Sequence, residues 1–441
     1  MKKLKGITSL LIYIVLCNCI PFCEVTEDTV FRWIIPLTLV AVWIAVSTAD
    51  KEKKKTVRRL ERMRKCCNMV KTAGITAVVE IFVLWWYIAE YSPKEAGLVF
   101  SIIIPVIIIA LTLFAGVAGI AVSSKQIKLT DHIALLLWWW VPVVNIFIVR
   151  KFYKTARREF IFESDRAELE NARKQNEICK TKYPVLMVHG IFFRDWQYFN
   201  YWGRVPASLI ENGAEIYYGN QQSASSIERS GAELAERIQE IIRETGAEKV
   251  NIIAHSKGGL DSRYAISCLG MDRYVASLTT INTPHKGCDM VDFLLDKAPS
   301  GFVSFLCRRY NGIFTKLGDN KPDFLAGVND LRASSAVSFN EKVQDSPGVV
   351  YRSYMSVMSS FRSAFFVLGI SYLLIKKLNG ANDGLVYEGS AVHGEHTLIT
   401  NKRTRGISHG DVIDLMRENI DGYDVREFYV DILKNLKEKG L

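Results

Sequence analysis

One serine stands in a sequence context that could make it a nucleophile. Ser256 lies in the hexamer AHSKGG, which follows the apolar run 250–253 and precedes the helix-like stretch 260–269. A strand, a tight turn with small residues two before and two after the serine, and a helix form a nucleophile elbow, which presents the hydroxyl for attack on a carbonyl carbon. The alternative interpretation is that Ser256 only caps the N-terminus of the following helix.

A nucleophilic serine needs a histidine base and a carboxylate that orients this base. In folds with such an elbow, they follow in the order serine, acid, histidine. Three of the seven histidines come late enough in the chain, namely His393, His396 and His409. His409 is the predicted base, because its flexible loop GISHG would let it move between nucleophile and leaving group. Asp383 in ANDGL is the predicted acid, although Asn-Asp-Gly alone is more typical of an ordinary turn.

The negative charge that develops on an attacked carbonyl oxygen needs two backbone N–H donors. In an elbow, the residue after the nucleophile supplies one of them, which is Lys257 here. The other is expected from the loop after an early strand, where HGIF follows the apolar run 185–188. Ile191 is the predicted donor and Phe192 the second choice, because Gly190 lets the backbone approach the site.

Strand and helix patterns alternate through the second half of the chain and predict an α/β fold. Apolar residues at helical spacing fill 227–243, and short apolar runs of strand type occur at 185–188, 214–218, 250–253, 276–281 and 349–355. Buried strands that alternate with helices indicate a doubly wound, mostly parallel sheet with helices on both faces. A strand, elbow and helix unit fits this architecture.

The first 150 residues are apolar enough to indicate a membrane region. Hydrophobic residues make up 49% of the chain, and a helix needs about 20 mostly apolar residues to cross a bilayer. Four or five transmembrane helices are predicted from the stretches 6–22, 30–46, 73–91, 97–122 and 133–149. The first stretch also suits a signal peptide. The last contains Pro142 and Asn145, and it could span, tilt in or re-enter.

Charge predicts how this region is oriented in a bacterial plasma membrane. The formal net charge is +10, and ten Lys and Arg residues lie between 51 and 71. Such a loop is cytoplasmic by the positive-inside rule. Five spans would then place the C-terminal half outside the cytoplasm, which is our expectation. The basic residues between 150 and 158 favour the opposite side.

Composition argues against two other classes of site. The nine cysteines include no Cys-x-x-Cys pair, so we expect reduced thiols and no zinc site. The basic residues adjoin apolar stretches without interleaved aromatic residues, so nucleic-acid binding is not expected. The chain is thus predicted to contain a membrane region at 1–150, a charged helical linker at 151–182 and a globular domain at 183–441.

Several of these motifs together resemble the secreted bacterial triacylglycerol lipases of the α/β-hydrolase superfamily. The resemblance covers 183–441 and rests on YPVLMVHG, AHSKGG, TPHKG and NDGLV in this order, and on the later stretch HGD. It implies the same nucleophile, acid, base and two oxyanion donors, which are Ser256, Asp383, His409, Ile191 and Lys257. It also implies a lid-like insertion at about 300–324.

The chain departs from this family at several points. Asp411 matches a calcium ligand of those lipases, but the mainly apolar stretch 361–374 offers no second aspartate ahead of Asp383, which argues against a calcium site. No cofactor is required by the predicted chemistry. The apolar stretch 365–375 is too short to span a bilayer and is expected in the core or at an interface. The region 1–150 has no counterpart in those lipases.

The combined prediction is a membrane-anchored serine hydrolase that cleaves carboxylic esters of lipids through an acyl-enzyme. An acylglycerol or another lipid ester would reach it from the bilayer. One alternative is a phospholipase or an acyltransferase on the same scaffold. Another is a non-catalytic membrane interaction protein that retains a hydrolase domain.

Overall fold

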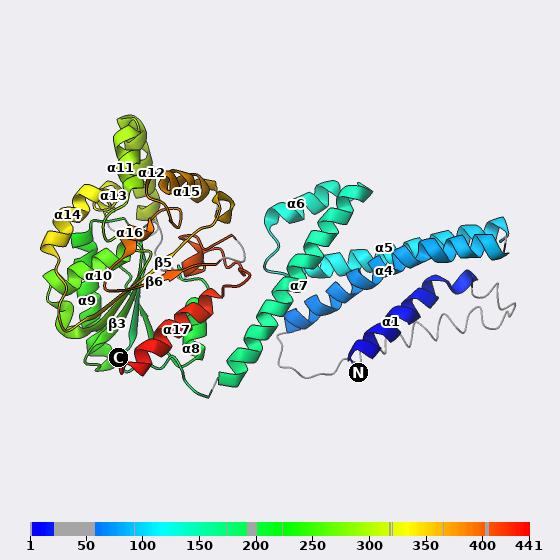
Figure 1. The fold of residues 1–441 in the computed structure, drawn as a ribbon, viewed down its shortest axis with the longest axis horizontal. Helices are drawn as coiled ribbons and strands as arrows, with labels where there is room; N and C mark the ends of the chain where they lie inside the picture. The colour runs from blue at the N-terminus through cyan, green and yellow to red at the C-terminus, as the bar shows by residue number, and fades with distance from the viewer. Residues whose placement is uncertain are drawn as a thin grey trace. The chain divides into compact units, whose positions relative to one another are not determined.

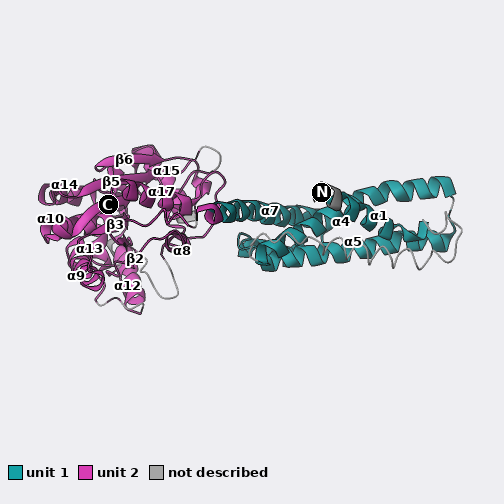
Figure 2. Cartoon of the chain, turned by 90° about the horizontal axis from the view of Figure 1, so that it is seen from below, with its two compact units in different colours: residues 1–169 teal, residues 170–441 magenta. Residues whose placement is uncertain are grey.

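The computed structural model divides the chain into two compact units (Figure 2). Unit 1 comprises residues 1–169 and unit 2 comprises residues 170–441. The structure describes residues 2–21, 58–91, 93–173, 175–191, 201–222, 224–316, 319, 321–364, 366–401 and 405–441. The span predicted at 30–46 lies outside the described residues, as does Phe192.

Unit 2 is built on a six-stranded sheet in which all neighbouring strands are parallel. The strand order is β2-β1-β3-β4-β5-β6. The strands are β1 (Val185–Val188), β2 (Ile216–Tyr218), β3 (Val250–His255), β4 (Val275–Ile281), β5 (Val350–Ser356) and β6 (Glu395–Ile399). The predicted parallel α/β sheet is confirmed. Strand β6 was not predicted, because its segment EHTLI contains no apolar run.

Helices cover both faces of this sheet (Figure 1). One face carries α8 (Val205–Glu211) and α17 (Val425–Glu438), and the other carries α9 (Ile227–Thr245) and α10 (Lys257–Cys268). Side chains alternate between the faces along a strand. Met187 therefore packs in one buried cluster with residues of α8 and α17, whereas Leu186 packs in another with residues of α9 and α10.

Helical insertions follow β4 and β5. The elements besides those above are η1 (Met271–Tyr274), α11 (Asp289–Lys297), α12 (Ser300–Lys316), α13 (Phe324–Asn329), α14 (Ala333–Lys342), η2 (Phe361–Ser363), α15 (Phe366–Leu378), α16 (Glu388–Ala391) and η3 (Asp411–Ile413). The predicted lid segment contains α12, on which Phe302 and Phe305 are exposed. In α15, Ile370 is exposed and Ile375 is buried, so this helix is amphipathic.

In unit 1, three helices pack together: α1 (Lys2–Cys17), α4 (Arg58–Tyr91) and α5 (Glu95–Ser123). By length and composition, α4 and α5 could each cross a membrane. Polar side chains of α1 find partners on these helices. Asn18, just after α1, donates to Glu80 over 2.8 Å, and the Tyr13 hydroxyl donates to Thr112 over 2.8 Å.

A buried glutamate ties three segments of unit 1 together. Glu159, on α7 (Pro142–Arg173), pairs with Arg59 at the start of α4 over 2.5 Å. It also accepts from the Ser124 hydroxyl over 2.6 Å, directly after α5. The Arg59 guanidinium also donates to the Ser123 carbonyl over 2.7 Å. The start of α4, the end of α5 and the middle of α7 therefore meet at one end of unit 1.

Among the described residues, two helices are long and apolar enough to span a membrane, so the predicted four or five spans are not shown. Among the described residues, α1 and α6 (Leu129–Trp138) are shorter apolar helices than α4 and α5. The stretch 133–149 is not one helix, because α6 ends at Trp138 and α7 begins at Pro142. Proline lacks a backbone N–H and its ring clashes with the preceding turn, so it is favoured at the first turn of a helix, where Pro142 lies.

The predicted linker 151–182 is divided between the two units in the structure. Its first part belongs to α7 in unit 1, whereas its end is bonded within unit 2. Arg173 forms a bidentate ion pair with Glu427 on α17, with N···O distances of 2.5 and 2.7 Å. The Lys182 N–H donates to the Leu441 carbonyl over 2.8 Å. Residues 170–182 are therefore part of the folded hydrolase-like unit.

Candidate active site

Ser256 lies at the turn between the central strand β3 and α10. Its backbone has φ 55° and ψ −131°, a conformation that costs a non-glycine residue of the order of 1–3 kcal/mol and marks functional sites. The Ser256 N–H donates to the Ile281 carbonyl of β4 over 2.9 Å, which helps to hold the turn. The Ser256 hydroxyl makes no capping hydrogen bond to α10. The alternative interpretation as a helix cap is therefore wrong.

The small residues around Ser256 are required by close approaches of the backbone. A Cβ on Gly190 would lie 2.8 Å from Ser256 Cβ, and a Cβ on Gly259 would lie 2.3 Å from Thr283 Oγ1. A Cβ on Gly258 would lie 2.4 Å from the His189 carbonyl oxygen. The loop after β1 and the elbow after β3 are thus packed against each other with no room for side chains.

We expect Gly258→Ala to destabilise unit 2. Its new methyl group would also lie 2.9 Å from the Val188 carbonyl oxygen, so both close contacts are with backbone at the end of β1, and the strand must move. Overpacking of this kind costs about 1–3 kcal/mol. Pulse proteolysis of the full chain in increasing urea should show a lower midpoint for unit 2.

Gly312→Ala is the matched control for this variant. Gly312 lies within α12, and a Cβ there would have no heavy atom within 4 Å. Alanine is the better helix former by up to about 1 kcal/mol, so the urea midpoint should stay or rise. A Gly258→Ala midpoint equal to that of the wild type would contradict the packing argument.

Asp383 and His409 form a buried pair. His409 Nδ1 lies 2.6 Å from Asp383 Oδ2, and the His409 N–H donates to the Asp383 carbonyl over 2.9 Å. Asp383 Oδ1 accepts from the N–H groups of Leu385 and Val386, each over 2.8 Å. Nδ1–H therefore donates to the carboxylate, and Nε2 is left with a lone pair that can accept a proton.

This pair lies beside the elbow. The ring of His255, the residue directly before Ser256, has its centroid 4.5 Å from that of His409. The structure thus places His409 next to Asp383 and next to the residue that precedes Ser256. No hydrogen bond between the Ser256 hydroxyl and the His409 ring is present among the described residues. The other two late histidines have different partners, Asp345 for His393 and Ser353 for His396.

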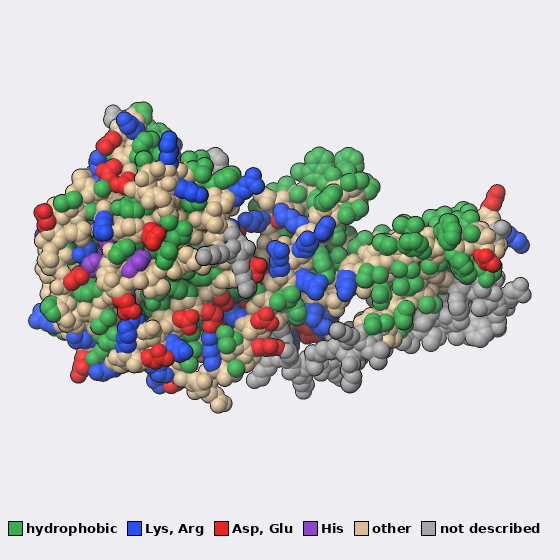
Figure 3. Space-filling model, viewed as in Figure 1, with side chains coloured by type: hydrophobic (Ala, Val, Ile, Leu, Met, Phe, Trp, Pro, Cys, Tyr) green, Lys and Arg blue, Asp and Glu red, His purple; other side chains and the backbone are tan. Residues whose placement is uncertain are grey.

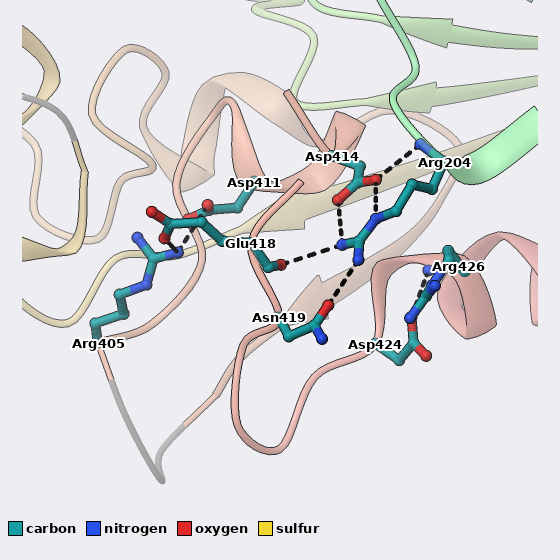
Figure 4. Close-up of polar contacts among 8 residues, drawn as sticks. All are labelled: Arg204, Arg405, Asp411, Asp414, Glu418, Asn419, Asp424 and Arg426. Atoms are coloured by element: carbon teal, nitrogen blue, oxygen red, sulfur yellow. Dashed lines mark hydrogen bonds and ion pairs between the residues drawn. The ribbon is translucent and has the colours of Figure 1, made fainter. Parts of the chain in front are cut away.

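The loop that carries His409 is anchored by arginines (Figure 4). Arg405 pairs with Asp411 over 3.0 Å and with Glu418 over 2.8 Å. Arg204, before α8, holds Asp414 with two guanidinium bonds of 2.7 Å each. The loop was predicted to be flexible on account of its glycines, but these ion pairs fix it on both sides of the histidine.

The same contacts show that Asp411 does not fit a calcium site. Arg405 lies at Oδ1, and Oδ2 accepts from the Ser408 N–H over 2.9 Å and from the Ser408 hydroxyl over 2.7 Å. A positive guanidinium at 3.0 Å repels a divalent cation. No group of three or more His, Cys, Asp or Glu side chains suited to a metal ion occurs in the part of the chain that the structure describes. Calcium therefore has no part in the reaction proposed below.

The predicted oxyanion donors are Ile191 and Lys257. Ile191 directly follows Gly190, which packs on Ser256, and Lys257 is the first residue of α10. Within the described residues, neither of their backbone N–H groups donates to an acceptor. The Gly190 N–H instead donates to the Tyr201 hydroxyl over 3.0 Å, which excludes it as a third donor.

Three polar contacts that support this site were not predicted. The Lys257 ammonium is buried and pairs with Asp261 over 2.6 Å, a partner that the spacing i, i+4 on a helix could have suggested. The Tyr201 hydroxyl lies 2.6 Å from His255 Nδ1 and so connects the elbow with Gly190. The Thr283 hydroxyl donates to the Ser256 carbonyl over 2.8 Å. The TPHKG motif thus has a supporting role at the elbow.

We expect unit 2 to lose stability as the pH falls below about 6.5. Burial lowers the pKa of both His255 and His285 well below the ordinary value. The folded state keeps both rings neutral while the unfolded state takes up protons. Each histidine then lowers the free energy of unfolding by up to about 1.4 kcal/mol per pH unit. Urea midpoints from pulse proteolysis between pH 7.5 and 5 should fall accordingly.

His285→Gln is the variant that checks this cause. Glutamine can still donate to Thr280 Oγ1, which lies 3.0 Å from His285 Nε2, but it does not titrate. The dependence of the midpoint on pH should become shallower by about half. An unchanged slope would assign the acid sensitivity to other groups.

Residues 180–295 match the model of a domain family described as "Putative serine esterase (DUF676)". Unit 2 is similar to serine esterases and lipases. The triacylglycerol lipase of Pseudarthrobacter phenanthrenivorans is 33% identical over 172 residues, which are 36% of this chain and 53% of that lipase. The triacylglycerol lipase of Vibrio cholerae is 37% identical over 135 residues, or 30% of this chain and 43% of that lipase.

The lipase-like unit spans about half the length of the curated relatives that it matches. Among solved structures, that of Staphylococcus hyicus lipase is similar over 59% of this chain and 97% of that chain, with 18% sequence identity and a TM-score of 0.46.

Proposed function

We propose that this chain is a serine hydrolase that cleaves carboxylic esters of lipids. The observation that carries the proposal is the buried Asp383–His409 pair, which lies beside a serine with elbow geometry. A serine in a strained turn, a histidine with a free Nε2 and an orienting carboxylate are the parts that acyl transfer requires.

The reaction follows from the roles of these groups. Ser256 Oγ attacks the ester carbonyl carbon as His409 Nε2 takes its proton, and Asp383 stabilises the resulting imidazolium. The N–H groups of Ile191 and Lys257 stabilise the oxyanion. Collapse of the intermediate releases the alcohol, which takes its proton from His409, and leaves an acyl-enzyme. A water activated by His409 then releases the carboxylic acid.

Lipid esters are favoured as substrates by two observations. The curated relatives described above are triacylglycerol lipases, and the chain has two helices that by length and composition could cross a membrane. An enzyme held at a bilayer meets esters that water-soluble enzymes reach poorly. Phospholipase and acyltransferase activity would use the same acyl-enzyme, with a different alcohol or acceptor.

Unit 1 anchors the chain in the membrane in this proposal, with α4 and α5 as an antiparallel pair of spans. The start of α4 and the end of α5 meet at Arg59 and Ser123. This end carries the basic residues that the positive-inside rule assigns to the cytoplasm. Because 133–149 is not one span, unit 2 is expected on the cytoplasmic side, in contrast to the expectation from five spans. Protease added to the outside of intact spheroplasts should leave unit 2 uncut.

The test of the enzymatic proposal is labelling of the full chain in detergent with a fluorophosphonate, which reacts with activated serines. Mass spectrometry should find the label on Ser256 and free fatty acid as the product from acylglycerols. An acylated acceptor in place of fatty acid would indicate a transferase. If folded protein takes up no label at Ser256, the chain is a non-catalytic membrane protein and the proposal is wrong.

A further inference from the structure

Residues 129–149 form a helical hairpin that is too short to cross a bilayer. The first arm, α6, has 10 residues, which is about 15 Å at 1.5 Å per residue. The second arm is the apolar start of α7, from Pro142 to Val149. The hydrocarbon core of a bilayer is about 30 Å thick, so each arm reaches about halfway through it.

Two contacts join the bases of the two arms. Lys151 on α7 pairs with Asp131 on α6 over 2.5 Å, and the rings of His132 and Phe152 have centroids 5.6 Å apart. Figure 1 shows the arms meeting in a tight turn. Residues 129 and 151 are thus at the same end of the hairpin, and the turn at 139–141 is at the other.

The outer surface of this hairpin is apolar and exposed. In Figure 3, hydrophobic side chains cover its outer end, and Lys and Arg side chains gather nearer its base. Eight of its large apolar side chains are between 48% and 74% exposed, namely Leu136, Leu137, Trp138, Trp139, Trp140, Val143, Ile146 and Phe147. Leu135, Ile148 and Val149 instead pack against the buried cluster of unit 1. No Asp, Glu, Lys or Arg occurs from residue 132 to residue 149.

Three donors at the turn bond to backbone carbonyls of the hairpin, whereas Asn145 Oδ1 is buried without a hydrogen-bond partner among the described residues. The Trp140 indole N–H donates to the Leu137 carbonyl over 2.9 Å, and the Val141 N–H donates to the Trp138 carbonyl over 3.1 Å. The Asn145 amide donates to the Trp139 carbonyl over 3.0 Å. In water, the carbonyl groups of a turn can accept hydrogen bonds from water molecules. In hydrocarbon they must be paired within the protein.

The base of the hairpin is positively charged, in contrast to its apolar arms. Arg150, Lys154 and Arg158 follow the second arm and are exposed. Clusters of Lys and Arg directly beside a membrane-inserted segment bind anionic lipid head groups. The charges therefore lie at the level of head groups when the apolar arms lie in hydrocarbon.

We propose that residues 129–149 are a re-entrant hairpin that enters one leaflet of an anionic bilayer and leaves on the side on which it entered. The proposal rests on the membrane anchoring of unit 1 in the proposed function. It holds Lys128 and Lys154 on one side of the membrane and places the turn at 139–141 within the lipid. The hairpin thereby fixes unit 1 to one leaflet of the bilayer.

The test uses full-length protein with all cysteines replaced, in sealed vesicles of one orientation that contain phosphatidylglycerol. Single cysteines are introduced by Lys94→Cys between α4 and α5, and by Lys128→Cys and Lys154→Cys on either side of the hairpin. All three positions are exposed. A membrane-impermeant maleimide should label Lys128→Cys and Lys154→Cys from one side and Lys94→Cys from the other.

The outcomes separate the two proposals. If Lys128→Cys and Lys154→Cys are labelled from opposite sides, the stretch spans the membrane and the hairpin proposal is overturned. If Lys94→Cys is labelled from the same side as Lys128→Cys, α4 and α5 do not cross, and the proposed membrane anchoring fails.

A fourth variant measures the depth of the turn. Trp139→Cys should be labelled at least about tenfold more slowly than Lys128→Cys, because hydrocarbon disfavours the charged thiolate. A bimane fluorophore attached there should be quenched by lipids brominated on their acyl chains, and one at Lys154→Cys should not. Fast labelling without quenching would place the turn in water or against a partner protein and would overturn the proposal.

Discussion

The Ser256→Ala variant should lose hydrolysis of p-nitrophenyl esters, with kcat about 10⁶-fold below that of the wild type. Without Oγ, no acyl-enzyme can form, and the oxyanion donors and the binding site alone remain. The protein should still fold, because Ala retains the Cβ that packs near Gly190 and the hydroxyl makes no capping bond. Steady-state kinetics with short and long acyl chains in detergent measure the loss.

Ser338→Ala is the matched control for this variant. Ser338 is an exposed serine on α14, and its hydroxyl bonds only within that helix, to the Ser335 carbonyl. Its kcat should equal that of the wild type. If Ser256→Ala retained a tenth of the wild-type kcat, another nucleophile would be at work, and the proposed mechanism would fail.

Asp383→Asn should lower kcat by about 10⁴-fold and leave KM nearly unchanged. An asparagine Oδ1 can still accept from the Leu385 and Val386 N–H groups, as the carboxylate does now. Its Nδ2 then faces His409 Nδ1, which must accept instead of donate. The ring proton moves to Nε2, and His409 can no longer take the proton of Ser256.

Asp296→Asn controls for the loss of one carboxylate. Asp296 is exposed on α11 and pairs with Arg332, so its replacement should change kcat by less than about twofold, since exposed ion pairs contribute little. The urea midpoint of each variant should be measured together with its kcat, so that a loss of stability can be told from a loss of catalysis. A loss of kcat in Asp383→Asn that tracked a lower midpoint would indicate a structural role alone.

The elements of the site that depend on short-range pattern were predictable from sequence. The strand, elbow and helix around Ser256 follow from an apolar run and small residues, and the order of acid and base follows from the elbow. Strand β6 was missed because an edge strand has one solvated face and needs no apolar run. The ion pair between Arg204 and Asp414 joins residues 210 positions apart in sequence, so no local pattern shows this anchor of the His409 loop.

The apolar residues 1–150 show a different limit of prediction from sequence. Hydropathy identifies how many apolar residues a stretch contains, but it does not show where the helix ends. The break between Trp138 and Pro142 changes the stretch 133–149 from a fifth span into two short arms. One helix boundary therefore reverses the expected side of the whole hydrolase unit.

The all-parallel sheet also has a consequence for the order in which this protein matures. Each parallel pair needs a long connection, and the segment between Ile281 at the end of β4 and Val350 at the start of β5 is the longest of these. Domains fold from the N-terminus during synthesis. A growing chain therefore has its serine elbow long before Asp383 and His409 leave the ribosome.

The last helix, α17, is the final element to be synthesised. Tyr429 and Leu433 of α17 pack in the same buried cluster as Met187 and Ile253 of the central strands. Until the C-terminus is released, α8 alone covers this face of the sheet. In the proposed mechanism, the nascent chain therefore has a nucleophile without its base until nearly the whole chain is made.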